Sequence, residues 1–447
     1  MEPPRSELPR RIGGFTAACL LISNVIGSGI FTATGFMARD LGHPWLILAV
    51  WFFGALLALA GALSYSELGT ALPVAGGEYA YLRRAYGPLI GFLSGWTSFT
   101  VGFSAAIAAG AMSFSAYLLQ IAPFHSENGP LSTAIALTLI WIVTGFHLAG
   151  VGPGGFLQRL LTTLNIGAIL VLVLGVLMFG KGNWTNLSLS APDVTPDVGA
   201  TMVSLIFVTY AYSGWNAAAY VAGEIVDPGH TIPRAMIGGT LFVGLLYLIV
   251  NGIYLYALPV TELGQPPILP VANKVAAAML GQTGTLWVTI LLCLSIAGAV
   301  SAMVWAGPRV YYAMACDGVI PACFSNNAGL TGTPSNAIVL QSLWASILIL
   351  SGTFERLIIY SGVVLAVFSA LAVGSLMVLR RRNPELARPY RVPFYPLVPL
   401  SYVILSATIA VYGFIERPIE AGLGIATVLA GVPLYVLWTQ LRGRQRN

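Results

Sequence analysis

Twelve long apolar runs constrain the fold of this chain more than any other feature of its sequence. A helix needs about 20 mostly apolar residues to cross a bilayer, and each run reaches about that length. The runs span residues 12–38, 44–71, 86–120, 131–150, 155–180, 198–224, 233–258, 284–315, 334–353, 355–380, 396–415 and 419–441. Only 8% of the residues are charged, whereas soluble proteins carry about 25%. The sequence therefore predicts an all-α polytopic membrane protein with 12 transmembrane helices.

Basic residues are distributed unevenly between the two sides of these predicted helices. With the N-terminus inside, 16 of the 21 Lys and Arg residues fall on the inner side, many of them in the segment RRRNPELARPYR at 380–391. Because cytoplasmic loops are enriched in Lys and Arg, the asymmetry predicts that both termini are cytoplasmic. It also accounts for the net charge of +5 without a nucleic-acid partner, since no aromatic-interleaved soluble module is present. We expect a multi-pass protein of the plasma or inner cell membrane, with the lipid bilayer as its surroundings.

Two of the runs are interrupted by glycine and polar residues near the middle of their length. The first contains SNVIGSGIF at 23–31, and the sixth contains YSGWN at 212–216. Irregular backbone survives at membrane depth only where it is buried in protein or lines a cavity. The two breaks are five runs apart, and five is odd, so the second set of five helices runs in the opposite direction. Matched breaks in two inverted halves indicate a transporter with a central binding site; close packing of helices at small residues is the alternative interpretation of either break alone.

The first break would expose backbone groups of both polarities. Unwinding at Gly27 frees the N–H groups of Ser28 and Gly29 at the start of a half-helix, where the helix dipole also attracts an anion such as a carboxylate. The half-helix that precedes the break leaves the carbonyls of Val25 and Ile26 without helical partners. These carbonyls can accept hydrogen bonds from an ammonium group.

The sixth run offers further carbonyl acceptors beside these groups. They belong to Tyr210, Ala211 and Ser213, at the end of the half-helix before the second break. A cluster of donors beside a cluster of acceptors suits a zwitterion, namely the backbone of an α-amino acid. The sequence therefore predicts an amino-acid site made mainly of main-chain atoms.

The distribution of acidic residues bears on the side chain of this substrate. Glu67, Glu78, Glu224, Asp227 and Asp317 all fall near the ends of predicted helices or in loops. A charged residue at mid-membrane would be a default functional candidate, and a cationic substrate would call for a buried carboxylate. We therefore expect a neutral amino acid as the cargo.

Four stretches of the chain are similar to signatures of one known family. SNVIGSGIF (23–31), ALSYSELGTALPVAGGEYAYLRRAYGP (62–88), FVTYAYSGWNAAAYVAGEIVDPGHTIPRAM (207–236) and PRVYYAMACDGVIP (308–321) resemble, in this order, motifs of the amino acid–polyamine–organocation superfamily. The pattern is most similar to the L-type amino acid transporter branch. The resemblance implies a LeuT-type core of 5+5 inverted repeats with discontinuous helices 1 and 6, followed by two accessory helices.

This resemblance divides the chain into five parts. They are an N-terminal cytoplasmic tail at 1–11, a transport core at 12–380 with repeats 12–180 and 198–380, a cytoplasmic basic loop at 381–395, the accessory helices at 396–441, and a C-terminal tail at 442–447.

The family's substrate site can be carried over residue by residue. The resemblance implies that the backbone N–H groups of Ser28 and Gly29 hold the carboxylate, and that nearby carbonyls hold the amine. Tyr210 stands where the family commonly has a gating Phe, and Trp215 follows it as a second gating residue. The expected substrate-binding residues are Val25, Ile26, Gly27, Ser28, Gly29, Tyr210, Ala211, Ser213 and Gly214.

The fifth run departs from the family pattern. Many members carry a Lys that faces the first break and is tied to ion coupling or exchange, and Asn165 stands at that place here. Asn has neither a positive charge nor a titratable proton. A sodium ion held near Ser23 and Ser295, uncoupled exchange, or a purely structural hydrogen bond of Asn165 all remain open. Neither a cofactor nor a metal site is expected beyond possible coupling to Na⁺ or H⁺.

The sequence thus predicts a secondary transporter of neutral α-amino acids that works by alternating access, as an exchanger or an ion-coupled symporter. The alternatives are a carrier of another small solute, such as a cation, polyamine or nucleobase, and a non-transporting amino-acid sensor. An enzyme would need clustered His, Asp, Glu or Cys at depth, which the runs lack. Animal L-type members bind a glycoprotein heavy chain through an outer-loop Cys, and because the loop IAPFHSENGP at 121–130 has none, no disulfide-linked heavy chain is expected.

Overall fold

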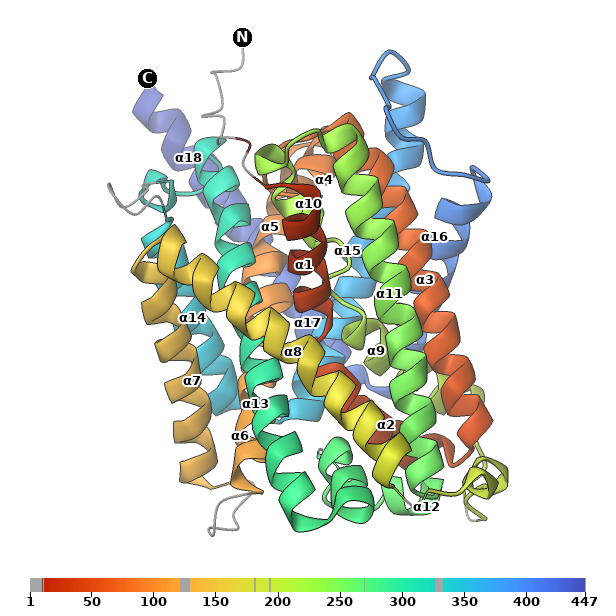
Figure 1. Ribbon diagram of the computed structural model, residues 1–447. Helices are drawn as coiled ribbons and strands as arrows, with labels where there is room; N and C mark the ends of the chain where they lie inside the picture. The colour runs from red at the N-terminus through yellow and green to blue at the C-terminus, as the bar shows by residue number, and fades with distance from the viewer. Residues whose placement is uncertain are drawn as a thin grey trace.

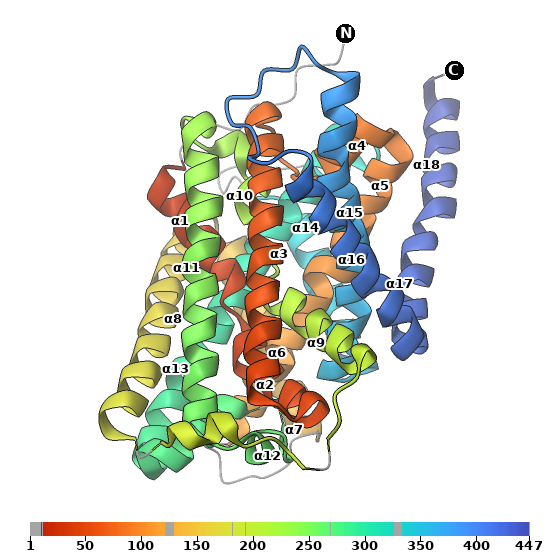
Figure 2. The same ribbon diagram turned by 90° about the vertical axis from the view of Figure 1, so that its right-hand side faces the viewer.

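Long helices running side by side form the architecture of this protein (Figure 1). The computed structural model of the 447-residue chain describes residues 10, 12–120, 129–180, 182–192, 194–268, 270–325 and 333–446. Within these residues all regular elements are helical, and a single bridge joins Ile12 to Ile225. The described chain begins and ends at the same end of the bundle, which we call the terminal end (Figures 1 and 2). The prediction of an all-α protein is confirmed for the described residues.

The helices in chain order are α1 Gly14–Val25, α2 Ser28–Leu41, α3 Pro44–Ala71, α4 Glu78–Tyr86, α5 Pro88–Thr97, the π-helix η1 Ser98–Phe103, α6 Ser104–Leu119, α7 Pro130–Leu148, α8 Val151–Phe179, η2 Trp184–Ser188, α9 Val198–Ala211, α10 Ala217–Tyr220, η3 Ala222–Glu224, α11 Pro228–Ala257, α12 Val260–Leu263, α13 Val271–Cys316, η4 Ala322–Phe324, α14 Ser335–Ser351, α15 Phe354–Arg382, α16 Leu397–Glu416, α17 Pro418–Leu429 and α18 Gly431–Arg446.

Ten segments of the described chain are long and apolar enough to cross a membrane. The apolar helices α9 and α14 are shorter, and α9 is short because the chain leaves the helix after Ala211. Large apolar side chains such as Phe53, Leu174 and Leu245 are exposed on the outward faces of α3, α8 and α11. Exposed apolar faces of this kind suit contact with lipid hydrocarbon, in keeping with a multi-pass membrane protein.

Small residues let the central helices approach one another closely. Residues 104–111 of α6 are all buried and are mostly Ala and Gly. α13 packs against both α6 and α8, while α11 packs against α3 and α15 against α16. Close approach of helix backbones at small residues is the usual way in which membrane helices associate.

Two helices differ from the ranges that the apolar runs suggest. α13 begins at Val271, well before residue 284, and is kinked at Gly281, where φ is 68° and ψ is −171°. The run expected to start at 86 is preceded by the separate helix α4, which packs against α5 and α15. Because α4 is amphipathic and mostly polar by composition, its burial inside the bundle is not evident from hydropathy. It brings Glu78 and Tyr81 into the interior.

Candidate functional site

The two interrupted helices meet at their breaks. α1 ends at Val25 and α2 starts at Ser28, while α9 ends at Ala211 and the short helix α10 starts only at Ala217. A Cβ atom at Gly29 would lie 2.6 Å from the Cα of Ala211, so only glycine allows this approach. The two breaks that the sequence identifies, although 187 positions apart in the chain, are therefore in direct contact.

Gly214 makes a second contact between the breaks. Its φ of +102° lies in a region that residues with a side chain rarely adopt. A Cβ there would also come within 2.8 Å of the carbonyl carbon of Asn24 in α1. Both the conformation and the space thus require glycine at this position.

The start of α2 presents main-chain donors that have no partner within their own helix. Its N-cap, Gly27, provides no side-chain hydrogen bond to the first turn. The first N–H groups of a helix have no partner within it, and those of Ser28, Gly29 and Ile30 are buried with their residues. The Ser28 carbonyl accepts a hydrogen bond from Thr32 Oγ1 at 2.7 Å. This arrangement is suited to a small anionic group such as a carboxylate.

The carbonyls at the ends of the first half-helices are each engaged by a side chain. The hydroxyl of Tyr247 in α11 donates to the carbonyls of Val25 at 2.7 Å and Ala211 at 3.1 Å. Asn165 Nδ2 in α8 donates to the carbonyl of Ile26 at 2.9 Å. A carbonyl oxygen has a second lone pair, so an ammonium group could still bind there. Tyr247 bridges the two breaks and carries no signal in the sequence that distinguishes it from an ordinary core tyrosine.

The three residues proposed for ion coupling are buried beside the first break. Ser295 in α13 donates its hydroxyl to Asn165 Oδ1 at 2.6 Å, so Asn165 links α13 to the Ile26 carbonyl. Ser23, in α1, is fully buried and also has an interaction partner. The amide of Asn165 thus braces the break through one donor and one acceptor, whether or not an ion binds there.

A cavity of about 110 Å³ lies beside the two breaks. It is bounded by α3, α5, the π-helix η1, α9, α15 and α16, and π-helical turns often occur at functional sites. Of the residues expected from the sequence, four line the cavity: Tyr210, Ser213, Gly214 and Trp215. Asn24, in the half-helix α1 before the first break, lines it as well. Val25, Ile26, Gly27, Ser28, Gly29 and Ala211 are not among its described lining residues but lie next to them.

The two predicted gating residues are packed among aromatic and hydroxyl groups. Tyr210 is buried and its side chain interacts with that of Ser28. Trp215 contacts Tyr65 edge-on, with ring centroids 4.8 Å apart, and Tyr402 at 6.0 Å. Tyr210 therefore connects the cavity to the first break, whereas Trp215 forms part of its wall on the side of α3 and α16.

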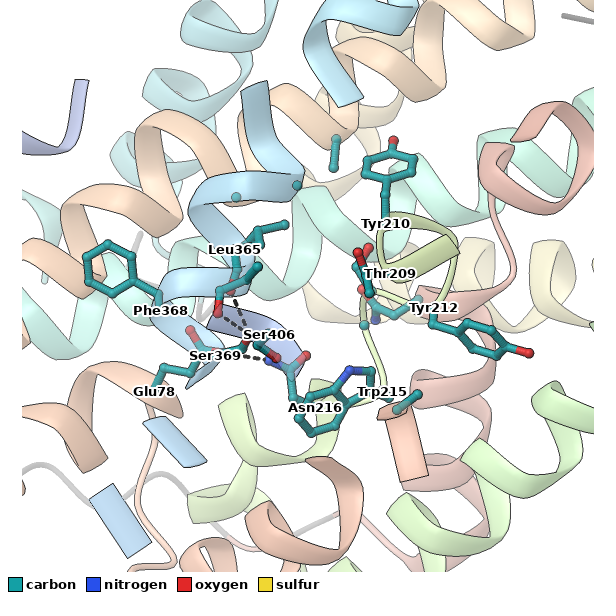
Figure 3. A pocket seen from close by; sticks show the side chains of 18 of the residues that line it. Glu78, Thr209, Tyr210, Tyr212, Trp215, Asn216, Leu365, Phe368, Ser369 and Ser406 are labelled. Carbon is teal, nitrogen blue, oxygen red and sulfur yellow. Dashed lines mark hydrogen bonds between the residues drawn. The ribbon is translucent and has the colours of Figure 1, made fainter. Parts of the chain in front are cut away.

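Glu78 and Asn216 are cavity residues that the sequence did not identify. Asn216 Nδ2 donates to Glu78 Oε1 at 2.8 Å, and the hydroxyl of Tyr65 donates to the same oxygen at 2.7 Å. Figure 3 shows the side chains of Glu78 and Asn216 close together in the lower half of the view, with Tyr210 well above them. The sequence places Glu78 near a helix end, and in the structure α4 folds into the bundle, so that this carboxylate lines the cavity. The acidic residue before a short helical stretch was visible in the sequence, but its burial was not.

Polar contacts join the breaks to other helices at the terminal end. Arg309 Nε in α13 pairs with Glu224 Oε1 at 2.9 Å, and the guanidinium lies 4.8 Å from the ring centre of Trp305. The backbone of Ile12 donates to the carbonyl of Glu224 at 2.9 Å and accepts from the N–H of Val226 at 2.9 Å. These contacts hold the start of α1 and the segment after α10 against α13.

The described residues do not bring three or more His, Cys, Asp or Glu side chains together as a metal site would require. The arrangement instead consists of main-chain donors and acceptors at two helix breaks, a small cavity and one buried carboxylate. Such an arrangement can bind a small polar solute and release it when the half-helices move.

Comparison with known proteins gives the chain its family. The family model for amino acid permeases matches residues 12–431. The large neutral amino acids transporter small subunit 2 of Mus musculus is 30% identical over 442 residues, which cover 96% of this chain and 81% of that protein. The Asc-type amino acid transporter 1 of Mus musculus is 29% identical over 452 residues, covering 99% and 83%. The serine/threonine exchanger SteT of Bacillus subtilis (strain 168) is 32% identical over 451 residues, covering 97% and 98%.

These relatives are transporters and not enzymes by name, and their similarity extends over nearly the whole chain. The resemblance seen in the four sequence motifs is thereby confirmed. With a family match that covers both breaks, the cavity and most of the helical bundle, this chain belongs to the amino acid permease family.

Proposed function

We propose that this protein is a secondary transporter that exchanges neutral α-amino acids across the cell membrane by alternating access. The observation that carries the proposal is the contact of two helix breaks, where the uncapped start of α2 lies against the end of α9. Donors for a carboxylate and acceptors for an ammonium group lie within one small region there. The names of the relatives, which include a transporter of large neutral amino acids and a serine/threonine exchanger, support this substrate class.

The finer architecture forms part of the same proposal. Ten long apolar segments together with α9 and α14 would make twelve spans, arranged as two inverted repeats of five and two accessory helices. The distribution of Lys and Arg orients both termini toward the cytoplasm. We also propose that no heavy chain is linked by a disulfide. The loop that would carry the linking cysteine falls largely on residues 121–128, outside the described residues, so this proposal rests on the sequence alone.

The substrate class can be tested by counterflow in proteoliposomes made from the purified protein. Vesicles loaded with unlabelled L-alanine, L-serine, L-leucine or L-phenylalanine are expected to accumulate the labelled form of the amino acid that is carried. Empty vesicles and protein-free liposomes provide the controls. Absence of counterflow with every neutral amino acid, together with saturable binding of one of them, would instead indicate a sensor.

A cationic substrate is the second candidate, and the buried carboxylate of Glu78 is the observation that favours it. The panel should therefore include L-lysine, L-arginine and a polyamine. Because two neutral donors already engage Glu78 Oε1, we expect these cations to compete poorly.

The coupling site is tested by the same assay with Na⁺, pH and internal amino acid varied separately, and by repeating it with Asn165→Lys. A variant that responds to all three as the parent does would remove Asn165 from the coupling mechanism.

A further inference from the structure

Glu78 lies at a junction of three elements that border the cavity. Its Oε1 accepts hydrogen bonds from Tyr65 in α3 and from Asn216 in the segment between α9 and α10, while Glu78 itself begins α4. The residue is only 6% exposed and lines the cavity. One carboxyl group thus connects α3, α4 and the second helix break.

The carboxyl group of Glu78 is not paired with a cation in the part of the chain that the structure describes. Among the residues that the structure describes, no Lys or Arg forms an ion pair with it, and Arg83 on the same helix pairs with Asp317. The titratable groups that interact with it electrostatically are tyrosines of α3, α4, α10 and α16, namely Tyr65, Tyr81, Tyr220 and Tyr402. A buried carboxylate without a compensating cation tends to take up a proton.

The cavity wall beside α4 also carries two buried hydroxyl groups that lack partners in the described part of the chain. They are Ser94 Oγ and Thr97 Oγ1, both on α5, which packs directly against α4. Both residues line the same cavity as Glu78, and both are at most 2% exposed. Buried polar atoms are normally hydrogen-bonded, so unpaired hydroxyls that line a cavity point to a polar occupant such as water. Ser369 of α15, a helix that also packs against α4, lines the same cavity.

We propose that Glu78 is a proton-binding site of the transport cavity, and that its protonation controls how firmly α3, α4 and the second break are held together. Hydroxyls of Ser94 and Thr97 would hold the water through which the proton reaches the carboxyl group. The proposal rests on the transport function proposed above, since it assigns a proton to the same cavity.

A proton fits this site better than a metal cation does. Both groups that contact Glu78 Oε1 are donors, a phenol and an amide N–H, and donors repel a metal ion. A proton needs only one free lone pair on the carboxyl group, which Oε2 provides. An ammonium group of a substrate would be limited to Oε2, because neutral donors already engage Oε1.

The direction of the pH effect follows from the surroundings of the group. Burial raises the pKa of Glu78 above its ordinary value, and the hydrogen bonds from Tyr65 and Asn216 oppose part of the rise. The conformation described here is therefore favoured, relative to one in which water reaches the carboxyl group, at pH values below the ordinary glutamate pKa of about 4.3. This preference is lost as the pH rises through the raised pKa. Higher pH should thus loosen the junction of α3, α4 and the second break.

Infrared difference spectroscopy of the purified protein tests proton binding without any transport. The C=O stretching band of a buried protonated carboxyl should titrate with a midpoint above the ordinary pKa of glutamate and should be missing in Glu78→Gln. Glu385→Gln, which removes an exposed glutamate from the basic loop, is the matched control and should leave the band in place. Tyr65→Phe removes one donor to the ionised form, so the midpoint should move upward by about one pH unit.

The transport consequence is measured by counterflow with equal pH on both sides, using the neutral amino acid that counterflow identifies. The parent protein should exchange severalfold faster above the infrared midpoint than below it, and Glu78→Gln should stay at the slow rate at every pH. If no band titrates, or if Glu78→Gln keeps both the band and the pH dependence, the proposal is wrong. A dependence on Na⁺ that Glu78→Gln abolishes, with no titrating band, would overturn it in favour of a metal cation. If the parent protein shows no counterflow with any amino acid while its infrared carboxyl band still titrates, only the proposed transport function is contradicted.

Discussion

At the scale of single residues, the site depends on the absence of side chains as much as on their presence. Gly29 and Gly214 allow two half-helices to touch through their backbones, so that main-chain groups of both breaks lie close together. Tyr247 and Asn165 then fix the carbonyls at the break. The glycines and their approximate role could be predicted from the sequence, because a Gly-x-Gly pattern inside an apolar run indicates either a helix break or close helix packing. Tyr247 could not, since one tyrosine on a buried helix resembles another until the packing is known, whereas Ser295, a candidate from the sequence, does contact Asn165.

Gly29→Ala tests whether the contact between the breaks is needed. The added methyl would overlap the Cα and Cβ of Ala211, and overpacking of this kind destabilises a protein by roughly 1–3 kcal/mol. We expect a lower unfolding temperature in detergent and loss of most counterflow activity.

Gly145→Ala in α7 is the matched control, because nothing lies within 4 Å of its added Cβ. The same change in a helix without crowding stabilises by about 0.5–1 kcal/mol. Full activity of Gly29→Ala would show that the two half-helices need not touch during transport.

At the scale of elements, the positions of the breaks follow from the sequence, whereas the position of α4 does not. Polar residues within an apolar run mark α1–α2 and α9–α10 directly. α4 reads as a short polar connection between two membrane helices, and only its packing against α5 and α15 brings Glu78 to the cavity. Such long-range packing depends on helices that lie far apart in the chain. For this reason the sequence alone did not show that a carboxylate lines the cavity.

The contact between Arg309 and Glu224 provides a test of how elements are held at the terminal end. This ion pair joins α13 to η3, just beyond the second break, and both side chains are mostly buried. Arg309→Gln and Glu224→Gln should each loosen this end, raise the rate at which the cavity opens there, and lower the unfolding temperature.

In a double-mutant cycle, the effects of the two changes on the free energy of unfolding should couple by about 1 kcal/mol or more. Arg356→Gln removes an arginine that is 71% exposed and lies 3.9 Å from Glu420, and it should have little effect on either measurement. Additive effects of the first two changes would show that Arg309 and Glu224 do not act as a unit.

At the scale of the whole molecule, charge is concentrated where the chain begins and ends. Arg380 and Arg388 of the basic segment contact the fully buried Glu67 at the end of α3, whose carboxylate also accepts from the backbone N–H of Val392 at 2.7 Å. The segment after α15 is thereby attached to the terminal end of the bundle. The number and spacing of the apolar runs indicated a polytopic helical protein, but hydropathy could not show that one acidic residue organises this basic loop.

The orientation in the membrane can be tested with cysteines that the protein already has. Cys316 and Cys323 are exposed free thiols at and just beyond the C-terminal end of α13, at the terminal end of the bundle. If both termini are cytoplasmic, a membrane-impermeant maleimide added to intact cells should not label them, and permeabilised cells should show labelling that Cys316→Ser and Cys323→Ser together remove. Ser190→Cys, in the exposed segment that links α8 to α9 at the opposite end, should be labelled in intact cells.

The physical reason for this outcome is the cost of moving the basic segment across the bilayer, which the positive-inside rule expresses. Labelling of Cys323 in intact cells, with Ser190→Cys protected, would mean that the molecule is inserted the other way round. The start of α1 and the Arg309–Glu224 pair would then face outward, and the contacts at the terminal end would close the cavity toward the outside. Because Glu78 lies on α4 near the same end, its proton would then be exchanged with the external solution, so the labelling result also decides from which side pH acts on transport.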